Sequence, residues 1–164
     1  MPRSGKIEKR IIAPDAIYKN QIVAKLINKV MVDGKKSIAV KIVYGALDKI
    51  KESNEDPIAI LEKAVENITP KMEVRPRRVG GASYMVPSEV RGVRRLSLSL
   101  SWLVAAARAR SPKEVGIIKN QPVMIAKLAQ EILDASAETG KAYSQKEEMH
   151  RMAEANKAFA HFRW

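Results

Sequence analysis

The residues in this chain best suited to chemistry are a group of arginines near one tyrosine. Arg75, Arg77 and Arg78 occupy three of four consecutive positions, within a segment, residues 71–95, that holds seven Lys or Arg and two Glu. A guanidinium group offers N–H donors in a planar fork that matches phosphate oxygens. Tyr84 adds an aromatic ring, on which an unpaired base can stack. The pattern favours nucleic-acid binding, with an ordinary solvated hairpin as the alternative.

A β-hairpin over residues 71–90 is expected to present these side chains. Gly80 and Gly81 supply the two positive-φ residues of a two-residue turn, and the flanking residues favour extended backbone. Pro76 and Pro87, one in each strand, lack a ladder N–H, so we expect a free two-stranded ribbon rather than part of a larger sheet. The expected cross-strand pairs are Arg75 with Val86, Pro76 with Met85, and Arg77 with Tyr84, which gathers two arginines and the tyrosine on one face.

Length and composition indicate one soluble domain over residues 1–164. The net charge of +12 implies a polyanionic partner. The chain has no cysteine and only two histidines, His150 and His161, so neither disulfides nor a zinc site is expected. No apolar stretch approaches the ~18 residues of a membrane span, so no membrane partner is expected. Nothing in the sequence points to a cofactor.

No arrangement of residues indicates catalysis. Ser83 and Ser88 have no histidine nearby in the sequence, and the carboxylates lie on solvated faces of expected helices. The Gly80-Gly81 pair lacks the strand-to-helix context of a nucleotide-binding loop. We therefore expect a binding or structural protein rather than an enzyme.

Apolar residues recur at helical spacing outside the hairpin, which predicts a mainly α-helical bundle of six helices, with the hairpin between the third and the fourth. The first helix is expected after Asn20, carries Ile22 to Met31 and is closed by Gly34. The second runs from about residue 35 to 53. Asp56 and Pro57 open the third, which ends before Pro70.

The last three helices are less regular in sequence. Residues 96–101 (LSLSLS) alternate as a strand would, but they continue into an Ala-rich helical stretch. Pro122 opens the fifth helix, Gly140 ends it, and Ser144 with Glu147 predicts a capping box at the start of the sixth. The fourth helix is expected after Ser88, with an apolar stripe of Val93, Leu96, Leu100, Leu103 and Ala107.

Three segments are expected to lie outside these elements. Residues 1–19 form an extended basic arm, and residues 111–121, which contain Pro and Gly, form a loop. The C-terminal AHFRW mixes aromatic and basic groups, which are expected either to dock on the core or to stack on bases.

Three separated segments carry a resemblance to a known family. KLINKVMVDGKKSIAVKIVYGAL, MEVRPRRVGGASYMVPSEVR and HRMAEANKAFAHFRW together resemble the bacterial-type small-subunit ribosomal protein seven family, in the family's order and over nearly the whole chain. The resemblance implies a body of six helices with a protruding hairpin. Met85 and Ser88 stand where the family more often has Gln and Val, Phe162 replaces a common Tyr, and the loop at 111–121 is longer than usual.

The same resemblance implies a role and partners. Members of the family are structural constituents of the small ribosomal subunit; they bind ribosomal RNA in its 3′ major domain, nucleate assembly of the head, and lie beside exit-site tRNA and messenger RNA. Small-subunit proteins nine and eleven are neighbours. A cytoplasmic ribosome is the expected location, with an organellar ribosome as the alternative.

The candidate RNA-binding residues come from the basic arm, the start of the second helix, the hairpin, the fourth helix and the sixth. A DNA-bending architectural protein is the alternative function, although such proteins insert an apolar wedge where this hairpin has Gly-Gly. The candidates are Arg3, Lys6, Lys9, Arg10, Lys35, Lys36, Arg75, Arg77, Arg78, Tyr84, Arg91, Arg94, Arg95, Arg108, Arg110 and Arg151.

Overall fold

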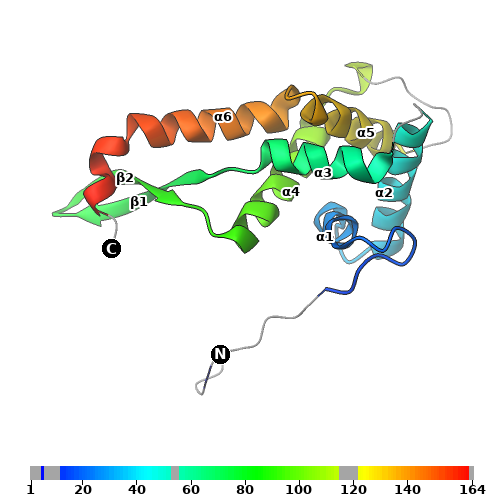
Figure 1. The fold of residues 1–164 in the computed structure, drawn as a ribbon, viewed down its shortest axis with the longest axis horizontal. Helices are drawn as coiled ribbons and strands as arrows, with labels where there is room; N and C mark the ends of the chain where they lie inside the picture. The colour runs from blue at the N-terminus through cyan, green and yellow to red at the C-terminus, as the bar shows by residue number, and fades with distance from the viewer. Residues whose placement is uncertain (1–4, 6–11, 53–55, 115–121, 163–164) are drawn as a thin grey trace.

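The computed structural model describes residues 5, 12–52, 56–114 and 122–162, and it confirms a mainly helical fold with one hairpin between α3 and α4 (Figure 1). Within these ranges lie the six expected α-helices, a seventh helix of 3₁₀ type (η2), and a single 3₁₀ turn (η1). In chain order the elements are α1 (Gln21–Val30), α2 (Lys36–Lys51), α3 (Pro57–Ile68), β1 (Met72–Val79), β2 (Ala82–Glu89), α4 (Gly92–Ala109), η1 (Pro112–Glu114), α5 (Val123–Ser136), α6 (Gly140–Ala155) and η2 (Lys157–Phe162).

Side-chain caps fix the starts of α1 and α3, and the cap at Asp56 was predicted. Asn20 Oδ1 accepts a hydrogen bond from the N–H of Ile22 at 2.7 Å, and Asp56 Oδ1 accepts one from the N–H of Ile58 at 3.0 Å. The predicted cap at Gly34 was wrong, because α1 ends earlier. Gly34 instead adopts a φ of 72° in the turn that leads into α2.

The alternating LSLSLS segment is helical and lies within α4. The hydroxyl of Ser99 donates to the carbonyl of Leu96, and that of Ser101 donates to the carbonyl of Ser97, so these serines satisfy their polar groups inside the helix. Val93 was wrongly placed in the apolar stripe. It is 72% exposed, because the first turn of α4 projects beyond the core toward the hairpin.

The predicted start of α6 was wrong. The helix begins at Gly140, and the hydroxyl of Ser144 donates to the carbonyl of Gly140, so Ser144 lies inside the helix rather than at its cap. The N–H of Ala142 in the first turn donates to Oε1 of Glu131, a wholly buried residue of α5, at 3.0 Å. α5 itself ends at Ser136, before the predicted end at Gly140.

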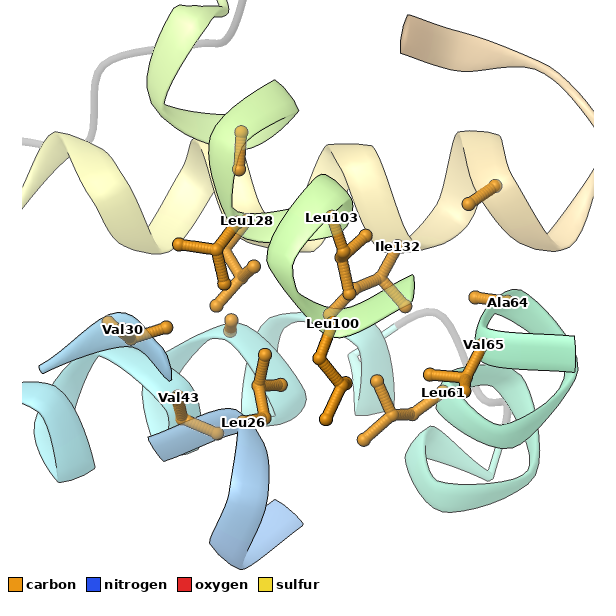
Figure 2. Close-up of a cluster of buried hydrophobic side chains, with 14 of the residues drawn as sticks. Leu26, Val30, Val43, Leu61, Ala64, Val65, Leu100, Leu103, Leu128 and Ile132 are labelled. Carbon is orange, nitrogen blue, oxygen red and sulfur yellow. The ribbon is translucent and has the colours of Figure 1, made fainter. Parts of the chain in front are cut away.

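The core forms where α5 packs against α2, α3 and α4. Leu26, Leu61 and Leu100 come from three different helices and are almost fully buried; Figure 2 shows them converging on the same cluster. Each such side chain contributes about 1.5–3 kcal/mol when removed from water. Gly45 permits a close approach of α2 to α5, because a Cβ atom there would lie 2.8 Å from Cδ1 of Ile125.

The described part of the predicted arm, from residue 12 onward, contacts α2. Oδ2 of Asp15 accepts a hydrogen bond from the N–H of Tyr18 at 3.1 Å, and the hydroxyl of Tyr44 in α2 donates to Oδ1 of the same carboxylate at 2.9 Å. The rings of Tyr18 and Tyr44 meet edge to face with centroids 5.7 Å apart. These contacts hold Asp15 and Tyr18 against α2.

The hairpin is a two-stranded sheet, as expected, but it does not project free of the other elements, because α6 and η2 lie along it (Figure 1). At its base the N–H of Lys71 donates to Nε2 of His150 at 3.0 Å. Burial and the positive charge of Lys146 lower the pKa of His150, although Glu147 opposes them. The lowered pKa favours the neutral imidazole, whose unprotonated nitrogen can accept this bond.

Candidate nucleic-acid interface

The hairpin has the predicted turn and register. Gly80 and Gly81 adopt φ values of 57° and 90° between the two strands, which pair antiparallel. Directly opposed residues share a face of the ribbon. The observed pairs include Arg75 with Val86, Pro76 with Met85, Arg77 with Tyr84, and Arg78 with Ser83.

A buried carboxylate ties the hairpin to the start of α4. Glu73 is 4% exposed; its Oε1 accepts a hydrogen bond from Nε of Arg75 at 2.6 Å and its Oε2 one from Nε of Arg94 at 2.7 Å. Burial alone would raise the pKa of Glu73, but the hydrogen bonds from Arg94 and Arg75 outweigh it and lower the pKa. The carboxylate therefore stays ionised and holds two guanidinium groups side by side.

Sequence reasoning did not identify this role of Glu73. The signal was available, because Glu73 lies two residues before Arg75 and side chains of a strand repeat on one face with period two. The contact with Arg94 depends on how α4 follows the hairpin, which no local pattern encodes. From the sequence alone, Glu73 was therefore only one of two glutamates in a basic segment, with no role assigned to it.

The first turn of α4 concentrates positive charge at a helix N-terminus. Arg91 is the exposed N-cap residue and makes no side-chain capping bond. Arg95 donates from Nε to the carbonyl of Val90 at 2.8 Å and from Nη2 to Glu89 at 2.9 Å. The turn contains no acidic residue. Since cations there oppose the helix dipole, a bound anion would be favourable.

A cavity of about 360 Å³ lies between the hairpin and the start of α4. It brings together four of the predicted site residues, all arginines, where the hairpin and α4 meet. Guanidinium groups from two elements can thus reach one ligand. The lining residues are Arg75, Arg77, Val86, Ser88, Glu89, Arg91 and Arg94.

Tyr84 lies in an aromatic cluster with the C-terminal helix η2. Its ring centroid is 5.1 Å from that of Phe159 and 5.3 Å from that of Phe162. Such packing stabilises the hairpin and fixes the position of η2 against it. Of the two expectations for the C-terminal segment, docking is the one the described residues show, but onto the hairpin rather than onto the helical core.

Several other predicted site residues lie away from the cavity, on different parts of the molecule. Lys35 and Lys36 are exposed at the start of α2, which lies at the opposite end of the body from the hairpin (Figure 1). Arg78 is exposed on the hairpin, and Arg151 is exposed on α6. The predicted arm residues Arg3, Lys6, Lys9 and Arg10 lie outside the described residues.

Two of the predicted residues make contacts between helices. Nη2 of Arg108 donates to the carbonyl of Val30, the last residue of α1, at 3.1 Å. Arg110 is largely buried and forms ion pairs with Glu131 and Asp134 of α5. Burial alone would lower the pKa of Arg110, but hydrogen bonds to Glu131 and Asp134 overcome it and raise the pKa. These guanidinium groups hold the body together.

Two kinds of feature are absent from the described ranges. No group of three or more His, Cys, Asp or Glu within them is placed to hold a metal ion. Among the helices that the structure describes, none combines the length and the apolar character needed to cross a bilayer.

Comparison with known proteins identifies the family. Residues 2–157 match the family described as ribosomal protein S7p/S5e. This chain belongs to the S7 family of ribosomal proteins. It is 59% identical to the small ribosomal subunit protein uS7 of Dictyoglomus turgidum and 58% identical to that of Caldicellulosiruptor bescii, over 100% of both chains in each case.

Membership of the S7 family agrees with the expectation drawn from the three sequence segments. The matched region contains the hairpin, the Glu73 ion pairs and the whole of α4. The family is one of ribosomal proteins rather than of enzymes. The arginine-lined cavity therefore belongs to a fold that is used in the small ribosomal subunit.

Proposed function

We propose that this S7-family protein is a structural constituent of the small ribosomal subunit that binds ribosomal RNA directly in the 3′ major domain and nucleates assembly of the head. The observation that carries the proposal is the set of guanidinium groups around the cavity between the hairpin and α4. Arg75 and Arg94 are already positioned by Glu73, so little ordering remains when phosphate binds.

The proposed RNA contacts extend beyond the cavity. The described end of the basic arm contacts α2, and the exposed cations of α2, the hairpin and α6 provide additional phosphate contacts. Arg108, Arg110 and Tyr84 are assigned a supporting role, because their described contacts lie within the protein. The direct contacts are assigned to Arg3, Lys6, Lys9, Arg10, Lys35, Lys36, Arg75, Arg77, Arg78, Arg91, Arg94, Arg95 and Arg151.

Further partners follow from the family. We propose that the hairpin tip and the C-terminal helices lie beside exit-site tRNA and messenger RNA, and that small-subunit proteins nine and eleven are neighbours in the head. The bacterial relatives favour a cytoplasmic ribosome over an organellar one. The DNA-bending alternative has less support, because the hairpin tip consists of two glycines rather than an apolar wedge.

Salt should weaken RNA binding steeply. Phosphate contacts release condensed counterions, and six or more of them reduce affinity by about 10³-fold or more between about 50 and 200 mM salt. We expect this loss for the full-length protein on a 3′ major domain fragment of small-subunit ribosomal RNA, measured by filter binding across a salt series. Affinity that changed by less than about tenfold would show that phosphate contacts do not dominate.

A further inference from the structure

Ser88 has an unusual environment in the arginine-lined cavity. Its Oγ exposes less than 1 Å² to solvent and has no hydrogen-bond partner among the described residues. Across the hairpin Ser88 is paired with Glu73, the carboxylate that holds Arg75 and Arg94. Buried hydroxyl groups are normally hydrogen-bonded, because leaving one unpaired is unfavourable. An unpaired hydroxyl beside a cluster of guanidinium groups therefore indicates a ligand.

The groups around Ser88 indicate the charge of that ligand. Arg94 uses its Nε for Glu73, and its guanidinium group carries two terminal amino groups that are further donors. The exposed Arg91 and the uncapped start of α4 add positive charge at the same cavity. Only an acceptor that carries negative charge complements a hydroxyl, guanidinium groups and a helix N-terminus together.

We propose that Ser88 and Arg94 bind one phosphate group in this cavity, with the Ser88 hydroxyl donating to a phosphate oxygen after rotation about its Cα–Cβ bond. This inference rests on the proposed function, since the phosphate is that of a ribosomal RNA backbone. The staggered rotamers of serine make the required rotation accessible.

The first test replaces Ser88 with valine, which carries two methyl groups and no hydroxyl, in the full-length protein. We expect Ser88→Val to weaken binding to the 3′ major domain fragment about tenfold, the loss typical of a hydrogen bond to a charged group. The thermal midpoint should stay the same or rise, because the substitution removes an unpaired buried hydroxyl. Ser83→Val changes an exposed serine of the same hairpin and should alter neither quantity.

A second test separates the phosphate site from the RNA. Inorganic phosphate, titrated to ~50 mM into the wild-type protein, should shift the NMR signals of the Ser88 amide and the Arg94 Nε, and Ser88→Val should reduce these shifts. If phosphate binds in this way but the RNA fragment does not bind, the cavity assignment stands and the proposed function fails. If Ser88→Val binds both the RNA and phosphate as the wild type does, the inference is overturned.

Discussion

Replacing Arg75, Arg77 and Arg78 together by alanine should lower affinity for the ribosomal RNA fragment by about a hundredfold or more and flatten its salt dependence by about 2–3 units of log–log slope. The reason is the loss of up to about three phosphate contacts, each of which releases close to one counterion. The fold should survive, because Arg75 is half exposed and Arg94 continues to pair with Glu73. Filter binding across a salt series measures both quantities.

Two controls make this result specific. Lys51, Lys63 and Lys141 are exposed on the helical body, and their combined replacement by alanine removes the same charge. That variant should lose much less affinity. Alanine at both Gly80 and Gly81 keeps every charge but disfavours their positive φ values, so it should misplace the hairpin and reproduce part of the arginine effect. An unchanged slope in the triple arginine variant would show that the hairpin does not contact RNA phosphates.

Glu131→Ala should lower the free energy of unfolding by about 3–5 kcal/mol, because it removes one of the two ion-pair partners of the largely buried Arg110. Glu131 is fully buried, pairs with Arg110, and accepts a hydrogen bond from the N–H of Ala142 at the start of α6. For a protein of this size such a loss lowers the thermal midpoint by roughly 6–20 °C. Calorimetry or urea unfolding of the purified variants provides the measurement.

The control for this prediction is an exposed glutamate on α6. Glu148→Ala should change the free energy of unfolding by no more than about 0.5 kcal/mol. Glu131→Gln keeps the shape and one acceptor oxygen, so it should fall between the two. A loss of less than about 1 kcal/mol in Glu131→Ala would contradict the assignment of Arg110 to the support of the body.

Much of the fold could be predicted because its determinants are local. The Gly80-Gly81 pair fixed the turn, and the period of two then placed Arg77 opposite Tyr84. Asn20 and Asp56 cap helices that begin next to them. The LSLSLS segment was also assigned correctly, because the surrounding helical stretch outweighs six alternating residues.

The errors arose where distant residues decide the structure. Ser144 and Glu147 form an acceptable capping box in sequence, but Glu131 of α5 caps α6 one turn earlier. Support of the hairpin by α6 and η2 likewise depends on contacts such as that between Lys71 and His150. The site shows the same limit. The basic residues could be identified by their type. Which of them line the cavity and which of them connect helices depends on the residues that they contact, and the sequence does not give those contacts.

Chemical protection mapping of small-subunit ribosomal RNA, with and without the purified full-length protein, tests the central claim most directly. We predict protections confined to a compact set of nucleotides in the 3′ major domain, with those nearest the hairpin lost in the triple arginine variant and retained in the triple lysine variant. Protections spread over all domains, or a footprint that both variants leave unchanged, would contradict the assignment of the hairpin and α4 as the RNA-binding surface.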